Sequence, residues 1–200
     1  MELLFKFFIT IIVSYLVGSI PTGYIIVKTK TGDDIRKIGS GSTGATNVKR
    51  VLGKKWFFIT LLLDAFKGAL PVVIANLFVT GDVYGIAPVL AAIFVIIGHS
   101  KSCFLGFNGG KSVASGVGTI LALNFTVGVI IAVIWEIITY VSKYVSLGSI
   151  IALLVSPLLM YLFKSPIAYI LYCVLGAIYI VYLHRENIKR LINGNENKVR

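Results

Sequence analysis

The sequence predicts an all-α integral membrane protein, a polytopic bundle of about seven transmembrane helices. Three observations lead to this fold class. The mean hydropathy of the 200 residues is +0.92, and only 14% of them are charged, against about 25% in a soluble domain. Apolar runs recur along the whole length and are too continuous for the alternating strands of a membrane barrel. Helices fit such runs, because a helix satisfies its own backbone hydrogen bonds inside lipid.

Seven apolar segments justify the seven helices. The first two are long enough to cross a bilayer with some tilt. The third and fourth are short, so a re-entrant pair is an alternative to two crossings. Between the fourth and fifth we expect a break near Asn124. No soluble domain of any size interrupts the series, which predicts one transmembrane domain over 1–200. The segments are 3–27, 56–80, 83–98, 112–123, 125–141, 145–163 and 166–183.

Positive charge predicts the orientation. Four regions hold 16 of the 19 Lys and Arg residues, and the positive-inside rule places all four in the cytoplasm: 28–55, 99–111, Lys143 and 184–200. The N-terminus then lies outside and the C-terminus inside, which requires an odd number of crossings. Seven crossings fit, and five fit if the short pair re-enters, but six do not. We therefore expect a protein of the cytoplasmic (cell inner) membrane that acts on its cytoplasmic face.

The net charge of +11 does not indicate nucleic acid in such a protein. It marks cytoplasmic loops that also attract anionic headgroups or phosphorylated substrates. Common cofactor motifs fail as well. A P-loop needs four residues between its glycines, and Gly106 and Gly110 enclose three. A dinucleotide fingerprint would need a strand before Gly39. The two cysteines suggest no metal site, so we expect neither a metal ion nor a cofactor.

The first loop of chemical interest is GSGSTGATNVKR, residues 39–50. Glycine-rich backbone at a helix start exposes several N–H groups, which form an anion site with the helix dipole behind them. Hydroxyl groups add donors, and an arginine can grip phosphate through two hydrogen bonds. A flexible linker would not mix these groups so densely. We expect phosphate contacts from Gly39, Ser40, Gly41, Ser42, Thr46, Asn47 and Arg50.

Two further loops carry candidate site residues. In GFNGGKS, 106–112, Gly109 and Gly110 can cradle a phosphate with Lys111 as a point charge. In HRENIKRLINGNENK, 184–198, His184 and Asn187 share one face of a short amphipathic helix at the membrane surface. Catalysis or substrate binding by this pair is the functional interpretation, and a structural histidine is the alternative.

Asp64 and Lys67 are charged residues inside an apolar segment. Such residues are functional candidates by default. Because they stand three apart on a helix, they can pair and largely cancel each other's charge. We expect this pair to be structural.

Six stretches follow one another in the order found in a known family: GSIPTGYIIVK, IRKIGSGSTGATNVKRVLG, LDAFKGALPV, GFNGGKSVASGVG, YVSLGSI and HRENIKRLINGNE. On these motifs the chain resembles the bacterial membrane glycerol-3-phosphate acyltransferases that use acyl phosphate as donor. The family usually has Asn where this chain has Ser42 and Gly where it has Ser112. The segment GHSKSCF also lacks the family's usual proline.

The resemblance implies transfer of a fatty acyl group from acyl phosphate to the 1-hydroxyl of sn-glycerol 3-phosphate. The products would be lysophosphatidic acid and phosphate, in the first step of phospholipid biosynthesis, and the soluble enzyme that makes acyl phosphate would be a partner. The family pattern gives essential positions to Ser40 and Arg50, to Lys111 with its glycines, and to His184 and Asn187. Ser149 matches the serine of the family's VSLGS motif.

Two mechanistic alternatives stay open. His184 can be the general base, since its unperturbed pKa is near 6.5, or the phosphate of the substrate can take the proton while His184 orients. We favour the second, because no carboxylate stands near His184 in sequence to fix its tautomer. The sequence does not assign either phosphate to a particular loop. The rival classes, an anion transporter and a basic lipid-binding scaffold, explain the cytoplasmic glycine loops less well.

Size argues against acyl-CoA as the donor. The cytoplasmic segments are short and already serve as helix ends and anion loops, which leaves too little chain to enclose a nucleotide. Acyl-CoA enzymes commonly use a His-x-x-x-x-Asp dyad. Neither histidine has it, since Phe104 follows His99 and Lys189 follows His184 at that spacing. We expect turnover with acyl phosphate alone.

Overall fold

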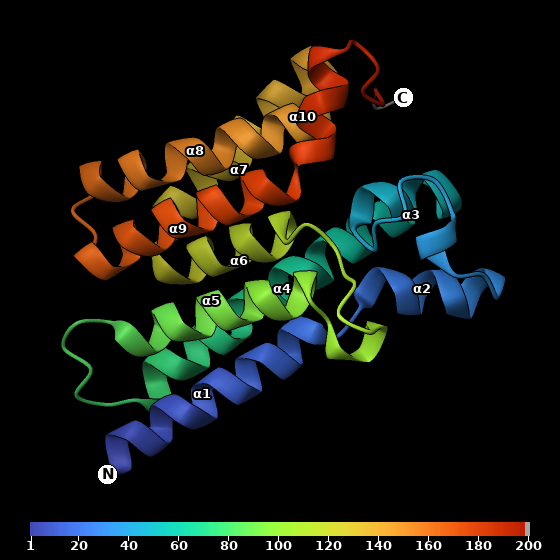
Figure 1. Cartoon of the computed structure of the whole chain (residues 1–200). Coiled ribbons are helices and arrows are strands. Elements are labelled where there is room, and N and C mark those ends of the chain that lie inside the picture. Colours follow the sequence, from blue (N-terminus) through green and yellow to red (C-terminus); the bar gives the residue numbers. More distant parts are fainter. Residues whose placement is uncertain (199–200) are drawn as a thin grey trace. The chain divides into compact units, whose positions relative to one another are not determined.

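The computed structural model describes residues 1–198, and all the regular elements in that part are helices (Figure 1). Contacts divide the chain into two compact units, Met1–Thr119 and Ile120–Arg200. The all-helical prediction is confirmed, while the single domain over 1–200 stays a prediction. The first unit contains α1 (Glu2–Ser19), α2 (Thr22–Thr31), the 3-10 turn η1 (Ile35–Lys37), α3 (Ala45–Leu52), α4 (Lys54–Phe78), α5 (Ile86–Ser100), the 3-10 turn η2 (Cys103–Leu105) and the start of α6 (Val113–Leu123).

Helices α1, α4 and α5 pack side by side in the first unit (Figure 1). Glycines allow the closest approaches. A methyl group added to Gly18 of α1 would overlap the backbone of Val95 in α5, and one added to Gly98 would overlap the carbonyl of Tyr15. In lipid the hydrophobic effect does not press helices together, so such small residues and the close packing they permit hold the helices in contact.

The first apolar segment is two helices, where a single one over 3–27 is predicted. Proline has no N–H, and it keeps the residue before it out of the helical region. Ile20 accordingly has φ −58° and ψ 113°, which ends α1 before Pro21. Helix α2 then continues to Thr31 and stops at Gly32, whose φ is 78°. After the break, α2 leads into the first glycine-rich loop.

A small apolar cluster fixes the region around that loop. The side chains of Ile26, Val27, Ile35 and Val48 are buried together, and Trp56 packs against them. They come from α2, η1 and α3, so the three short elements that flank residues 38–44 share one core. The loop is therefore built on a packed base.

The second unit contains α7 (Phe125–Ser142), α8 (Val145–Leu162), α9 (Ile167–Leu183) and α10 (Arg185–Ile192). Helix α8 packs on both α7 and α9. Helix α10 leaves α9 at an angle of 62°. The expected break near Asn124 is confirmed: its Oδ1 accepts from the Val127 N–H at 3.1 Å and caps α7. Its Nδ2 donates to Ser165 at 3.0 Å.

Within residues 1–198, five helical stretches are long and apolar enough to cross a membrane, and a sixth is added if the bent pair α9–α10 counts as one. The multi-pass membrane class is thus confirmed. Helix α6 has 11 residues and measures about 16 Å at 1.5 Å per residue, roughly half of a hydrocarbon core. The number of crossings and the orientation of the termini stay predictions.

Accessible cysteines test the predicted orientation. In a background lacking the two native cysteines, we introduce single cysteines at the exposed positions Asp33, Val83, Asn108 and Asn195. A membrane-impermeant maleimide should label Asp33→Cys, Asn108→Cys and Asn195→Cys only from the cytoplasm, and Val83→Cys only from outside. Labelling of positions 108 and 195 from opposite sides would contradict the odd number of crossings.

Candidate active site

The first loop winds around the side chain of Asn47, which is buried. Its Nδ2 lies 2.9 Å from the carbonyl oxygens of Ile38 and Ser42 and 3.3 Å from that of Ile35. Its Oδ1 accepts from the Ser40 N–H at 3.0 Å. A single buried amide therefore satisfies four backbone groups that the irregular loop would otherwise leave unpaired.

The glycines of this loop serve its shape. Gly39 and Gly41 have φ of 62° and 69°, in the left-handed region that glycine enters without cost. A methyl group on Gly39 would overlap Oδ1 of Asn47 and stand 3.6 Å from Cδ of Arg50. The structure thus brings Gly39, Ser40, Asn47 and Arg50 together, with Ser40 and Arg50 exposed.

Three backbone N–H groups of the loop donate within the loop, and phosphate binding by the loop stays a prediction. The N–H of Ser40 donates to Asn47, that of Gly41 to the Ile38 carbonyl, and that of Gly44 to the Ser42 hydroxyl at 3.3 Å. An N–H that is already donated offers little to an anion. Arg50 and the hydroxyl groups are further candidate donors to an anion, and Thr46 is half-buried at the start of α3.

Arg36 ties the first loop to the second, a link that sequence spacing did not indicate. Its guanidinium pairs with Asp34 at 2.7 Å and donates to the Leu105 carbonyl at 3.3 Å. It also lies 5.4 Å from the ring centre of Tyr24. The hydrogen bonds from Arg36 hold the pKa of the Asp34 carboxyl down at about 2, so the pair is fully charged at neutral pH.

In the second loop, Gly109 and Gly110 lie directly on His99. The Gly110 N–H donates to the His99 carbonyl at 3.1 Å. A methyl group on Gly109 would overlap that carbonyl, and one on Gly110 would overlap the imidazole. Both glycines are therefore required by close approach to one residue. They place the half-buried Lys111 next in the chain.

The departure at Ser112 has a structural explanation. Its φ is 59°, in the region where a residue other than glycine costs about 1–2 kcal/mol. This accounts for the glycine that the family usually has there. In this chain the Ser112 hydroxyl donates to the Ile96 carbonyl at 2.9 Å, a bond that glycine lacks and that offsets part of the cost.

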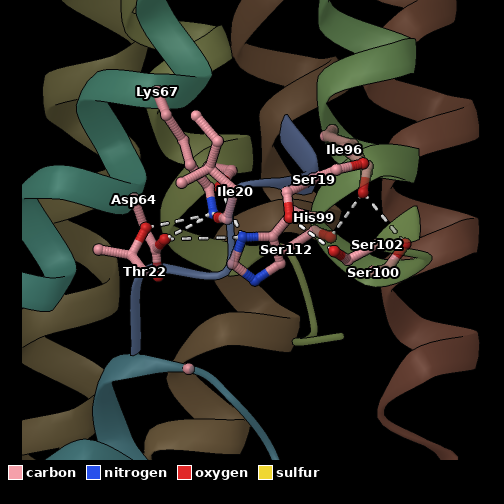
Figure 2. Close-up of polar contacts among 12 residues, drawn as sticks. Ser19, Ile20, Thr22, Asp64, Lys67, Ile96, His99, Ser100, Ser102 and Ser112 are labelled. Atoms are coloured by element: carbon pink, nitrogen blue, oxygen red, sulfur yellow. Dashed lines mark hydrogen bonds and ion pairs between the residues drawn. The ribbon is translucent and has the colours of Figure 1, made fainter. Parts of the chain in front are cut away.

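The expected pair of Asp64 and Lys67 forms in α4, with Nζ 2.8 Å from Oδ1 (Figure 2). The Lys67 ammonium also donates to the Ile20 carbonyl at 2.7 Å, at the break between α1 and α2, and lies 3.5 Å from the Thr22 hydroxyl. Oδ1 of Asp64 is 3.8 Å from Nδ1 of His99. The expected pairing is confirmed, and it lies at the helix break; its structural role stays a prediction.

In the second unit, His184 is buried where α9 ends and α10 begins. Its Nδ1 lies 2.8 Å from the Ile180 carbonyl oxygen. Since a carbonyl only accepts, Nδ1 carries the proton, and Nε2 of the neutral ring is an acceptor. A backbone carbonyl thus fixes the tautomer. No carboxylate stands near His184 in sequence for this task, and a backbone partner is not visible from side-chain spacing.

Glu196 organises the third motif, and sequence reasoning did not single it out. One oxygen accepts from Asn187 at 2.7 Å and from Ser146 at 2.9 Å, and the other accepts from Arg190 at 2.7 Å. Burial raises the pKa of Glu196, but these hydrogen bonds outweigh it and the pKa lies below its ordinary value. The carboxylate is therefore ionised at neutral pH and fixes the Asn187 amide.

Ser149 is buried between α7 and α8. Its hydroxyl donates to the Val145 carbonyl at 2.8 Å and accepts from Nε1 of Trp135 at 3.2 Å. A phosphate oxygen needs a donor, and the Ser149 proton is already donated in this arrangement. Its role in substrate binding stays a prediction. Among the described residues, His, Cys, Asp and Glu side chains form no group of three or more that could hold a metal ion.

Comparisons with known proteins agree over nearly the whole chain. The sequence model of a family described as glycerol-3-phosphate acyltransferase matches residues 8–194. A glycerol-3-phosphate acyltransferase of Trichormus variabilis is 42% identical over 203 residues, covering 94% of this chain and 90% of the relative. The corresponding protein of Thermotoga petrophila is 45% identical over 188 residues and covers 94% of each chain.

Two solved structures are similar to this chain over nearly its whole length. One is a crystal structure of PlsY, an integral membrane glycerol 3-phosphate acyltransferase, in its glycerol 3-phosphate form. It has a TM-score of 0.91 and 36% identity, covering 97% of this chain and 96% of that one. The lysophosphatidic acid form has a TM-score of 0.89 and 34% identity, covering 97% and 95%.

Proposed function

Because the chain belongs to the glycerol-3-phosphate acyltransferase family, we propose that it acylates the 1-hydroxyl of sn-glycerol 3-phosphate and produces lysophosphatidic acid. The observation that carries this proposal is the first loop. Its irregular backbone is satisfied internally by Asn47, while the guanidinium of Arg50 and the hydroxyl of Ser40 are exposed beside it. Such a loop presents charged and polar donors to an anion at little cost in reorganisation.

Acyl phosphate is the proposed donor. The substrate hydroxyl oxygen attacks the acyl carbon, the bond from that carbon to the phosphate oxygen breaks, and phosphate leaves with the bonding electrons. The leaving group is already activated, so the protein only needs to stabilise its charge and align the hydroxyl. Lys111 and Arg50 supply positive charge for this task. Ser40, Ser42 and Thr46 supply hydroxyl donors.

Two groups can accept the proton of the attacking hydroxyl. Nε2 of His184 is an acceptor in the tautomer that Ile180 fixes, which suits a general base. A phosphate oxygen of the substrate can serve equally, with His184 orienting the hydroxyl. We favour the phosphate. Asn187, held by Glu196, has an orienting role in either case.

The reaction is assigned to the cytoplasmic face of the cytoplasmic membrane. The basic residues around the first loop and on α10 support this face. Acyl phosphate would come from a soluble enzyme, and the product is an amphiphile that remains in the bilayer. The partners are therefore two small phosphorylated substrates, the lipid bilayer and the enzyme that supplies the donor.

A donor assay tests the proposed function. Purified protein in detergent should convert radiolabelled glycerol 3-phosphate to lysophosphatidic acid with palmitoyl phosphate, not with palmitoyl-CoA, and a chelator should not reduce the rate. Arg50→Lys keeps the charge but loses the planar fork, so kcat/KM should fall about a hundredfold while the melting temperature is unchanged.

The matched control is Lys54→Arg, an exchange of the same kind at the exposed start of α4, which should keep wild-type kinetics. Equal rates with both donors, or full activity of Arg50→Lys, would contradict the proposal.

Two substitutions separate the roles of His184. In His184→Asn the amide can still donate to Ile180, but no acceptor stands at the position of Nε2. In His184→Gln the longer side chain places its amide at the position of Nε2, and the bond to Ile180 is lost. If His184 orients, the asparagine variant keeps measurable turnover and the pH–rate profile keeps its shape, which is the result we expect. Loss of a titrating limb of the pH–rate profile, together with most of the activity of both variants, would make His184 the base.

A further inference from the structure

We propose that His99 is a positioning residue, whose imidazole supports the backbone of Gly110 and so sets the place of Lys111. The proposal rests on the proposed function in one respect, that the loop Gly109–Lys111 binds a substrate phosphate. No step of the mechanism above uses His99. It nevertheless lies between the buried pair of Asp64 and Lys67 and this loop.

The loop returns to the residue from which it started. His99 is near the end of α5, and ten residues later the chain lies back on it, with the Gly110 N–H donating to the His99 carbonyl. The imidazole covers the same glycine. A methyl group on Gly110 would overlap Nε2 and stand 3.0 Å from Cδ2 and 3.3 Å from Cε1. The backbone carbonyl and the imidazole of His99 thus both support the loop at Gly110.

The other edge of the ring faces polar groups of two further helices, and Figure 2 shows Asp64 of α4 beside it. Nδ1 shares a hydrogen bond of 3.0 Å with the hydroxyl of Ser115 in α6. Oδ1 of Asp64 in α4 lies 3.8 Å from the same nitrogen, and Lys67 pairs with that oxygen. Only 7% of His99 is exposed, so the ring has one orientation available.

These contacts define the role of His99. Nε2 faces the Gly110 backbone, which makes His99 a support and not a group that touches substrate. Without the ring, a space of imidazole size opens beneath Gly110. The loop can settle into it and carry Lys111 away from the phosphate. A displacement of about 1 Å in a positioning group lowers a rate by about a hundredfold.

The test is a double-mutant cycle between His99 and Gly110. His99→Asn keeps an amide near Nδ1 for Ser115 and removes the edge beneath Gly110, and Gly110→Ala adds the methyl that meets that edge. Each single variant should lower kcat/KM by about tenfold to a hundredfold at an unchanged melting temperature. In the double variant the methyl occupies the space left by the ring, so kcat/KM should be no lower than in Gly110→Ala alone. The proposal would be overturned if the loss of kcat/KM in the double variant equalled the product of the two single losses. Wild-type kinetics of a folded His99→Asn variant would also overturn it.

The Michaelis constants distinguish positioning from general destabilisation. Displacement of the loop should raise KM for one of the two phosphorylated substrates, whereas loss of folded protein would lower kcat and leave both KM values unchanged. His99→Gln, whose amide reaches the position of Nε2, should recover part of the loss and serves if His99→Asn does not fold. The control is Thr60→Val, which removes a buried hydroxyl of α4 bonded only within its helix and should keep wild-type kinetics.

Failure of this inference and failure of the proposed function give different results. If wild-type protein acylates glycerol 3-phosphate and Arg50→Lys does not, but the cycle is additive, only the role of His99 is wrong. If the wild-type protein has no activity with acyl phosphate, the proposed function itself is wrong.

Discussion

The ion pair between Asp64 and Lys67 is the interaction on which the rest of the first unit depends. Both side chains are almost fully buried in a helix that is otherwise apolar. A charge in such a place costs several kcal/mol unless it is paired and hydrogen-bonded. Here the ammonium also donates to the Ile20 carbonyl, which lies at the end of α1 before Pro21 and accepts one further hydrogen bond, from the Thr22 N–H. The carboxylate lies beside His99. One pair therefore stabilises both a helix break and the support of a loop.

A common construction links the three loops. Each contains a glycine with positive φ or a glycine in close contact, and each is held by one polar residue: the side chain of Asn47 in the first, the carbonyl and ring of His99 in the second and the carboxylate of Glu196 in the third. The buried group satisfies the irregular backbone or fixes a neighbouring side chain. Exposed groups such as Arg50 and Ser40 are the ones that we propose bind anions. The residues that fix the conformation of a loop thus differ from those proposed to contact substrate.

Much of the fold followed from local sequence. Hydropathy located the seven apolar segments, and spacing predicted the pair of Asp64 and Lys67. Pro21 signalled the break in the first segment, but the continuous hydropathy concealed it. The links from Arg36 to Leu105 and from Asn187 to Glu196, and the contact of His99 with Gly110, depend on how the chain returns in space. No local spacing encodes such contacts.

A comparison of Lys67→Met with the double variant Asp64→Asn/Lys67→Met tests the central claim most directly. Thermal unfolding of both, and of the wild type, is measured in the same detergent. Lys67→Met leaves the buried carboxylate unpaired and should cost about 3–5 kcal/mol of stability. The double variant has no buried charge and should unfold at a higher temperature than Lys67→Met alone. Unfolding of Lys67→Met at the wild-type temperature, or unfolding of the double variant at a lower temperature than Lys67→Met, would contradict the account.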